Sequence, residues 1–270
     1  MKTKFLDFVE ISKRRSNSLV CVGLDVDPLK IPKHLQLQKD GVWIFLREII
    51  EATSDVVSSY KLNLAFFEAL GDDYLKIVRK TLLAIPDNIV TIADGKRGDI
   101  GNTSEKYAKV LFEDLNFTAA TVNPYMGEDS VEPFLRDETR GVFLLALTSN
   151  KGAKNFQFLK VGKRKLYEEV LHQTKNWGKK NLGFVIGATK ASELKNIRKI
   201  IPNAPLLIPG IGAQGGSVKE VVENGLTKKG TLFINSSRGI LYSSSGIDFA
   251  EAARKAAIDL KTEINQHKKY

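Results

Sequence analysis

Cysteine, histidine and long apolar runs are scarce in this chain of 270 residues. Cys21 is its only cysteine, so no disulfide can form within the chain, and a reducing, cytoplasmic location is expected. It stands in an apolar run, where a buried structural thiol is expected rather than a nucleophile. The histidines, His34, His172 and His267, are far apart and show no metal-ligand spacing, so no metal site is predicted. No run of about eighteen apolar residues occurs, so no membrane span is predicted.

The start of the chain and its internal composition favour one domain. Acidic side chains stand among the first ten residues, where a signal peptide would be apolar. Phe5, Phe8 and Val9 instead predict the inward face of an amphipathic helix within residues 1–18. No linker rich in proline, glycine or serine interrupts the chain, so a single domain over residues 1–270 is predicted, with a basic tail at 265–270.

Lysine and arginine outnumber the acidic residues by 41 to 31, which leaves a formal net charge of +10. Such a charge raises the possibility of a nucleic-acid partner. The densest basic groups, however, lie at 13–15, 163–165 and 268–269, without interleaved aromatic residues at strand spacing. The pattern therefore indicates a solvated surface and, more weakly, electrostatic steering of an anionic, phosphorylated substrate. No nucleic-acid partner is expected.

Short β-branched runs alternate with longer amphipathic patterns along the chain, at a step of roughly thirty residues that is typical of a βα unit. The predicted strands are Leu19–Asp25, Val56–Lys61, Ile89–Asp94, Ala119–Asn123, Val142–Thr148, Gly183–Ala188, Pro205–Pro209 and Thr231–Asn235. These strands and the helices between them predict an α/β fold, a single (β/α)8 TIM barrel with an N-terminal amphipathic helix. A doubly wound sheet is the alternative.

Amphipathic stretches fill the intervals between the strands. The predicted helices are Trp43–Ser54, Phe66–Ala84, Thr103–Asp114, Lys165–Trp177, Ala191–Ile201, Ser217–Asn224 and Ile247–Ile264. Asn102-Thr-Ser-Glu105 resembles a capping box at the start of the third of these helices.

The segment from Asp94 to Asp99 brings two carboxylates and one ammonium group together directly after an apolar run. Because side chains of a strand alternate between its faces, Asp94 and Lys96 should point the same way. Two acids beside one lysine hold that lysine protonated, which suits proton delivery without a metal. A surface salt-bridge cluster is the alternative interpretation.

A barrel requires its functional residues at the carboxyl ends of its strands. The polar residues found there are Asp25, Lys61, Asp94 with Lys96, Asn123, Ser149, Gln214 and Arg238. Every predicted strand but the sixth ends near such a residue, which supports the barrel.

The loops after the seventh and eighth strands predict a phosphate site. Gly210, Gly212 and Gly215 match a G-x-G-x-x-G pattern, but no acid at the end of the next strand could hold a ribose diol, so a Rossmann site is weakly supported. The glycines better fit a loop whose N–H groups approach an anion. Gln214 and Arg238 are therefore predicted to clamp phosphate, against the alternative of two turns with a solvated arginine.

Several segments occur together in the order expected of one family. They are Val22-Gly-Leu-Asp25, Tyr60-Lys-Leu-Asn63, Asp94-Gly-Lys-Arg-Gly-Asp-Ile100, Thr121-Val-Asn-Pro-Tyr125, Thr148-Ser-Asn150, Pro209-Gly-Ile-Gly-Ala-Gln214 and Ser237-Arg-Gly239. From about Phe5 to Ala253, the chain resembles the orotidine 5′-phosphate decarboxylase family, in the longer bacterial form sometimes called type 2.

The resemblance implies a carboxy-lyase that converts orotidine 5′-monophosphate to UMP and CO₂ in de novo pyrimidine biosynthesis, without a cofactor. Lys96 matches the lysine that protonates C6 of the pyrimidine, and Asp94 matches the carboxylate beside the carboxylate of the substrate. Asp99 matches an aspartate supplied to the neighbouring subunit of a homodimer, and Thr103 would accompany it.

The substrate-binding roles carry over in the same way. Asp25 and Lys61 match groups that hold the ribose hydroxyls, and Ser149 matches the serine that reads the pyrimidine edge. Gln214 and Arg238 match the phosphate ligands. Asn123 aligns with a position typical of this type and receives only a supporting role. Apart from the resemblance, the lysine-rich segment 151–165 is a lid candidate by its length and glycines alone.

Two rival functions stay open from the sequence. Sugar-phosphate enzymes such as keto-gulonate-phosphate decarboxylase and hexulose-phosphate synthase share an Asp-x-Lys-x-x-Asp pattern, but resemble metal-dependent enzymes with an extra acid near the second strand. Here that strand ends in Lys61 and the nearest acid is Glu68, which favours hydroxyl binding over Mg²⁺. A non-catalytic nucleotide- or nucleic-acid-binding protein fits the net charge, but not the grouping of Asp94, Lys96 and Asp99.

Overall fold

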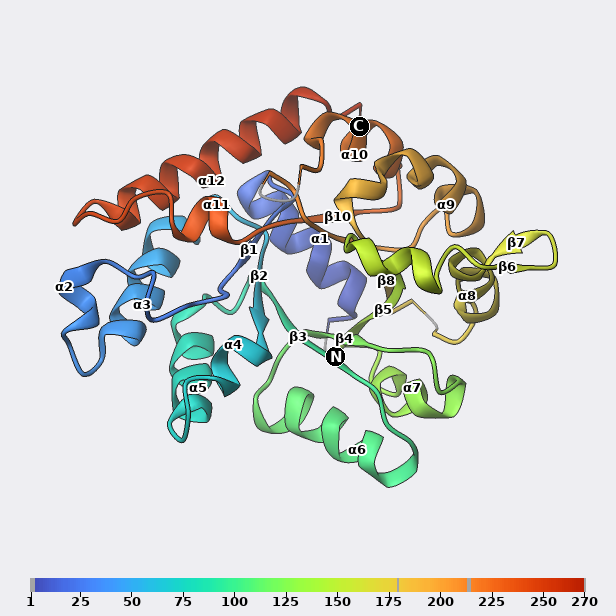
Figure 1. Cartoon of the computed structure of the whole chain (residues 1–270), viewed down its shortest axis with the longest axis horizontal. Coiled ribbons are helices and arrows are strands. Elements are labelled where there is room, and N and C mark those ends of the chain that lie inside the picture. Colours follow the sequence, from blue (N-terminus) through green and yellow to red (C-terminus); the bar gives the residue numbers. More distant parts are fainter. Residues whose placement is uncertain (1–2, 179, 213–214, 270) are drawn as a thin grey trace.

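Parallel strands close into a barrel in the computed structural model, which describes residues 3–178, 180–212 and 215–269 (Figure 1). Within these residues, eight strands follow one another around the barrel in the order β1-β10-β9-β8-β5-β4-β3-β2. The last strand closes on the first, with Val20 of β1 paired to Ile234 of β10. The predicted (β/α)8 barrel is confirmed, and the doubly wound alternative is wrong.

Each predicted strand is present, with bounds shifted by a few residues. The barrel strands are β1 Val20–Gly23, β2 Ser59–Asn63, β3 Val90–Arg97, β4 Ala119–Val122, β5 Gly141–Leu147, β8 Leu182–Ile186, β9 Leu206–Pro209 and β10 Leu232–Ser236. Their residues are buried almost throughout, because helices cover the outer face while side chains fill the interior.

The helices surround the barrel (Figure 1). They are α1 Phe5–Ser16, α2 Lys33–Gln36, α3 Gly41–Thr53, α4 Leu64–Glu68, α5 Tyr74–Ala84, α6 Gly101–Lys109, α7 Glu128–Leu135, α8 Leu166–Thr174, α9 Leu194–Ile200, α10 Val218–Gly225, α11 Arg238–Leu241 and α12 Phe249–Gln266. A π-helical turn, Val110–Asp114, continues α6, and two 3₁₀ turns span Lys151–Asn155 and Ala188–Glu193. Along the described residues, no helix has both the length and the apolar character needed to cross a membrane.

Two local predictions are wrong. The predicted helix Phe66–Ala84 is interrupted between α4 and α5, where Gly71 has a φ of 84°, a left-handed conformation that ends a helix. The predicted capping box also fails, because α6 already begins at Gly101 and its N-cap is Ile100, which makes no side-chain cap. The carboxylate of Glu105 instead pairs with Arg136 at 2.8 Å.

Helix α1 plugs one end of the barrel. Phe5 and Val9 are buried as predicted, whereas Phe8 is only partly buried. The Phe5 ring meets Phe143 of β5 edge to face at a centroid distance of 6.2 Å. Burial raises the pKa of the Cys21 thiol in the same inner core to about 12, which agrees with the predicted structural role. The open end of the barrel is therefore the opposite one, formed by the carboxyl ends of the strands.

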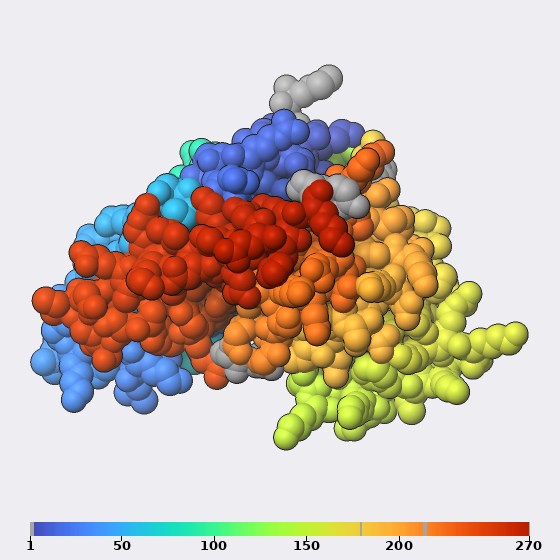
Figure 2. All heavy atoms as spheres, turned by 90° about the horizontal axis from the view of Figure 1, so that it is seen from above, coloured from blue at the N-terminus to red at the C-terminus, as the bar shows by residue number. Residues whose placement is uncertain are grey.

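The segment 151–165 projects from the side of the molecule opposite α1 (Figure 2). It contains the first 3₁₀ turn and a small hairpin of β6 Lys160–Val161 with β7 Arg164–Lys165. The lid candidate of the sequence thus has its own secondary structure beside the open end of the barrel.

Candidate active site

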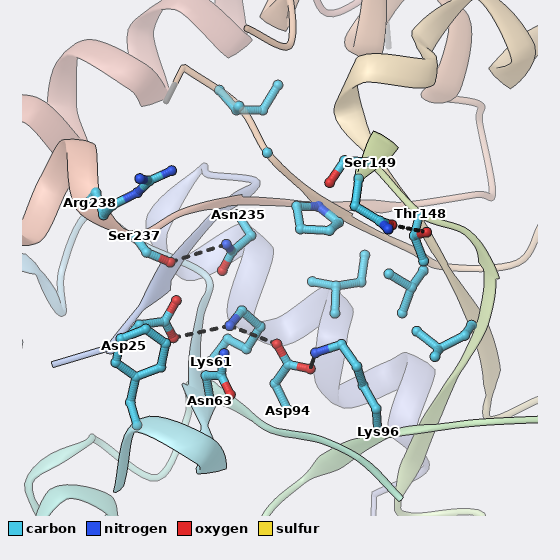
Figure 3. A pocket seen from close by; sticks show the side chains of 18 of the residues that line it. Asp25, Lys61, Asn63, Asp94, Lys96, Thr148, Ser149, Asn235, Ser237 and Arg238 are labelled. Carbon is cyan, nitrogen blue, oxygen red and sulfur yellow. Dashed lines mark hydrogen bonds and ion pairs between the residues drawn. The ribbon is translucent and has the colours of Figure 1, made fainter. Parts of the chain in front are cut away.

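A cavity of about 620 Å³ opens at the carboxyl ends of the strands. Its lining includes these residues predicted for the site: Asp25, Lys61, Asp94, Lys96, Ser149 and Arg238 (Figure 3). Leu145, Val185 and Leu207 from β5, β8 and β9 add apolar surface to it. Charged groups therefore face a partly apolar interior, where electrostatic interactions are stronger than in bulk water.

Asp25, Lys61, Asp94 and Lys96 form a charge array of alternating sign (Figure 3). Lys61 Nζ lies 3.2 Å from Asp25 Oδ1 and 2.9 Å from Asp94 Oδ2. Lys96 Nζ lies 2.7 Å from Asp94 Oδ1. The side chains of Lys61 and Asp94 are only 3% and 11% exposed, so a surface salt-bridge cluster does not describe this site.

Lys61 and Asp94, the central pair of the charge array, stay ionised because the opposite charges around each of them outweigh the effect of burial. Burial opposes ionisation of Asp94, but Lys61 and Lys96 hold the pKa of Asp94 well below its usual range. Burial likewise opposes the charge of Lys61, but Asp94 and Asp25 hold the pKa of Lys61 above its usual value.

Lys96 leaves the regular strand geometry. The register of β3 against β4 shifts between Ala93 and Arg97, and Lys96 has a φ of 45°, in the left-handed region that non-glycine residues rarely adopt. The predicted contact between Asp94 and Lys96 is present, but an irregularity in the strand accompanies it. The Lys96 side chain is 47% exposed at the cavity, within reach of a bound molecule.

Arg238 lines the cavity on the side opposite Lys96 (Figure 3). It is the first residue of α11, and only Ser237 separates it from the end of β10 at Ser236. Gly210, with a φ of 100°, lines the cavity from the loop after β9. Gln214, the other predicted phosphate ligand, lies outside the described residues. The two predicted phosphate loops thus both reach the cavity.

Ser149 lies in the turn that follows β5. The preceding residue, Thr148, is held by Gln157: Thr148 N donates to Gln157 Oε1, and Gln157 Nε2 donates to Thr148 Oγ1, both at 2.8 Å. The carbonyl of Ser149 accepts a hydrogen bond from Thr189 Oγ1 at 3.3 Å. The segment 151–165 is thereby anchored to the edge of the cavity.

Three predicted site residues, Asp99, Thr103 and Asn123, lie outside the cavity lining in the described part of the chain. Asp99 Oδ1 accepts from Ile100 N at 2.8 Å, and Thr103 is exposed on α6. Asn123 Oδ1 accepts from Tyr125 N at 3.0 Å within a local turn. A single copy of the chain therefore does not bring these side chains into the cavity.

Several polar residues of the cavity received no role from the sequence. Asn63 and Asn235 stand near the carboxyl ends of β2 and β10, and position alone could have identified them. Tyr242 lies just after α11 and had no comparable signal. Its hydroxyl accepts from Asp27 N at 2.7 Å and donates to the carbonyl of Asp25 at 3.2 Å, which ties α11 to the β1 loop.

A closed barrel with its charged groups gathered at the carboxyl ends of the strands defines an enzyme of the TIM-barrel class. Residues 18–256 match the family model described as orotidine 5′-phosphate decarboxylase / HUMPS family, and the chain belongs to this family. The resemblance found in the sequence is confirmed.

Individual relatives agree with the family match. The chain is 51% identical over 254 residues to orotidine 5′-phosphate decarboxylase of Flavobacterium johnsoniae, covering 93% of each chain. It is 47% identical over 272 residues to the enzyme of that name from Dehalococcoides mccartyi, covering 98% of this chain and 99% of the other. The solved OMP decarboxylase of Leishmania donovani superposes with a TM-score of 0.86 at 36% identity, covering 98% and 99% of the two chains.

Proposed function

We propose that this chain decarboxylates orotidine 5′-monophosphate to UMP and CO₂, the step that supplies UMP in pyrimidine biosynthesis. The observation that carries the proposal is the charge array of Asp25, Lys61, Asp94 and Lys96 in a cavity that Arg238 also lines. The relatives named above, which match nearly the whole chain, support the same reaction.

The proposed chemistry uses Lys96 as the proton donor. When the bond between C6 and the carboxylate breaks, CO₂ leaves and the electron pair stays on C6. The ammonium of Lys96 pairs with this developing charge, and its proton forms the new C6–H bond. Solvent can return a proton to Lys96, since its side chain is 47% exposed. A Schiff base, which needs a neutral amine, does not suit a lysine paired at 2.7 Å with Asp94.

The ends of the substrate are assigned to different parts of the cavity. Asp25 and Lys61 would bind the ribose hydroxyls, and Ser149 would read the pyrimidine edge. Arg238, with Gln214, would bind the phosphate, for which a guanidinium is suited by its paired donors. Because the phosphate lies away from the reacting carbon, its binding energy can contribute to positioning. Asn123 would support the site from the turn after β4.

Asp99 and Thr103 are proposed to act in the site of a partner subunit, which makes the chain a homodimer. Both stand outside the cavity of their own copy, and two large side chains, Ile100 next to Asp99 in the chain and Tyr125 in the loop after β4, face solvent in a single chain. Ile100 is 59% exposed and Tyr125 is 91% exposed. A second copy would bury these side chains.

Subunit mixing tests the shared site. Lys96→Ala and Asp99→Ala subunits, each inactive alone, should regain about a quarter of the wild-type activity when mixed in equal amounts, because about half of the dimers are then mixed and one of the two sites in each mixed dimer is intact. Mixing Lys96→Ala with Asp94→Ala is the matched control and should stay inactive. Failure of the first pair to recover would place Asp99 in the site of its own subunit.

The reaction itself is tested by adding orotidine 5′-monophosphate to the protein in EDTA and following the absorbance of the pyrimidine. Conversion to UMP that is insensitive to EDTA is expected. Loss of activity in EDTA with rescue by Mg²⁺ would favour the sugar-phosphate enzymes instead. Salt-sensitive binding to polynucleotides without turnover would favour the non-catalytic alternative.

A further inference from the structure

Thr121 of β4 links the backbone of Lys96 to the carboxylate of Asp94. Its hydroxyl donates to Asp94 Oδ1 at 3.0 Å and accepts from Lys96 N at 2.9 Å. The residue is 1% exposed and, within the described part of the chain, is not among the residues that line the cavity. The buried hydroxyl of Thr121 thus donates one hydrogen bond and accepts another, and both partners belong to the charge array.

The bond to Lys96 N stabilises an unfavourable backbone conformation. A left-handed φ at a residue with a side chain costs about 1–2 kcal/mol and persists only when surrounding contacts hold it. Lys96, at a φ of 45°, stands where the pairing of β3 with β4 is irregular. The hydroxyl of Thr121 accepts the Lys96 N–H at this point, so a side chain of β4 holds the Lys96 backbone.

The bond to Asp94 fixes the partner of the Lys96 ammonium. Asp94 Oδ1 accepts from both Thr121 Oγ1 and Lys96 Nζ, at 3.0 Å and 2.7 Å, while Asp94 Oδ2 pairs with Lys61 at 2.9 Å. The carboxylate is therefore held on both oxygens. Thr121 constrains Lys96 twice, through its backbone N–H and through the carboxylate that its ammonium binds.

We infer that Thr121 is a positioning residue for the reaction, which sets where the Lys96 ammonium stands relative to the reacting carbon. This inference rests on the proposed decarboxylation. A proton donor displaced by about 1 Å can lose roughly 10²-fold in rate, even when substrate binding is unchanged. Thr121 does not line the substrate cavity, so its effect should fall on kcat and not on KM.

Thr121→Val tests the inference because valine keeps the shape of threonine and removes the hydroxyl. We expect kcat to fall about 10²-fold, with KM for orotidine 5′-monophosphate within about threefold of wild type. Thr121→Ser keeps the hydroxyl and should restore kcat to within about tenfold of wild type. If Thr121→Val does not fold, kcat and KM of Thr121→Ala are compared with those of Thr121→Ser instead, and the same loss of kcat is expected.

Thr118, directly before β4, provides a matched control because its hydroxyl bonds to Thr91 of β3. Its hydroxyl accepts from Thr91 N at 2.7 Å and donates to the carbonyl of Thr91 at 2.8 Å, at the end of β3 and β4 away from the cavity. Thr118→Val removes an equivalent bridge, so it should lower the melting temperature while leaving kcat near wild type.

The outcomes separate this inference from the function on which it rests. A wild-type kcat in Thr121→Val, an equal loss of kcat in Thr118→Val, or no recovery in Thr121→Ser would overturn the positioning role alone. A wild-type protein that does not decarboxylate orotidine 5′-monophosphate would overturn the proposed function, and the inference with it.

Discussion

Lys61 and Asp94 form an ion pair of 2.9 Å inside the barrel, between adjacent parallel strands. Lys61 of β2 is in register with Ile92 of β3, so Asp94 stands two residues further along β3, on the same face. The pair fixes one cation and one anion in the wall of the cavity. Both charges are nearly withdrawn from solvent, so removing one should have a large effect on the other.

Lys61→Met should destabilise the protein by about 3 kcal/mol or more, because it leaves the buried Asp94 without one of its cations. Urea unfolding measures the change. Lys30→Met is the control, since Lys30 pairs with Asp27 at 2.9 Å with its side chain 58% exposed, and it should change stability by less than about 1 kcal/mol. Equal losses of stability in Lys61→Met and Lys30→Met would show that the buried position of Lys61 does not increase the effect.

The pH dependence of stability follows from the shifted pKa values of the same pair. The pKa of Asp94 is lowered in the folded protein, so its contribution is present above the unfolded value of about 4 and is lost as pH falls toward the folded value. The pKa of Lys61 is raised, so its contribution is present below about 10.4 and is lost as pH rises through the folded value. Urea unfolding below pH 4 should therefore show a steeper loss in wild type than in Asp94→Asn, whereas parallel curves would refute the Asp94 contribution.

Lys96→Ala should be folded but almost inert, with kcat/KM lowered at least about 10³-fold. The Lys96 side chain is 47% exposed, so the melting temperature should change little. Lys30→Ala removes another lysine of the cavity lining and should cost far less activity, which separates proton donation from general attraction of an anion. Substantial residual turnover in Lys96→Ala would remove the proton-donor role.

Arg238→Ala should lower kcat/KM for orotidine 5′-monophosphate by roughly 10²-fold or more, because a charge-assisted phosphate contact is lost. Arg238 is exposed, so thermal stability should be close to wild type. Orotidine, which lacks the phosphate, should be turned over equally poorly by the variant and the wild type. An unchanged kcat/KM with the phosphorylated substrate would refute the phosphate assignment.

Gly23→Ala should disturb the phosphate side of the cavity from β1. A Cβ at Gly23 would lie 1.9 Å from Ser237 Oγ and 3.1 Å from Asn235 Oδ1, so Ser237, which precedes Arg238, must move. We expect kcat/KM to fall roughly tenfold and stability to fall by about 1–3 kcal/mol, as in other overpacked cores. The double variant Gly23→Ala/Ser237→Ala removes the contact with Ser237 Oγ, so it should recover part of the lost kcat/KM and part of the lost stability. If neither recovers, the clash with Ser237 Oγ is not the cause of the losses.

Sequence alone determined the alternation of strands and helices, because each signal depends on residues that are near neighbours along the chain. It also predicted where Asp25, Lys61 and Asp94 gather, since parallel strands bring their carboxyl ends to one side. The errors at Gly71 and Ile100 came from helix boundaries, where similar local patterns permit more than one start or end.

Only the tertiary structure decided which of these residues interact and how strongly. Barrel closure joins Val20 to Ile234, and the bonds of Thr121 join β4 to β3, over separations that no local pattern encodes. The low pKa of Asp94 likewise requires that β2 carry Lys61 to within 2.9 Å of it in a buried setting. Desolvation and charge pairing are properties of the packed barrel, so they arise only when these distant segments meet.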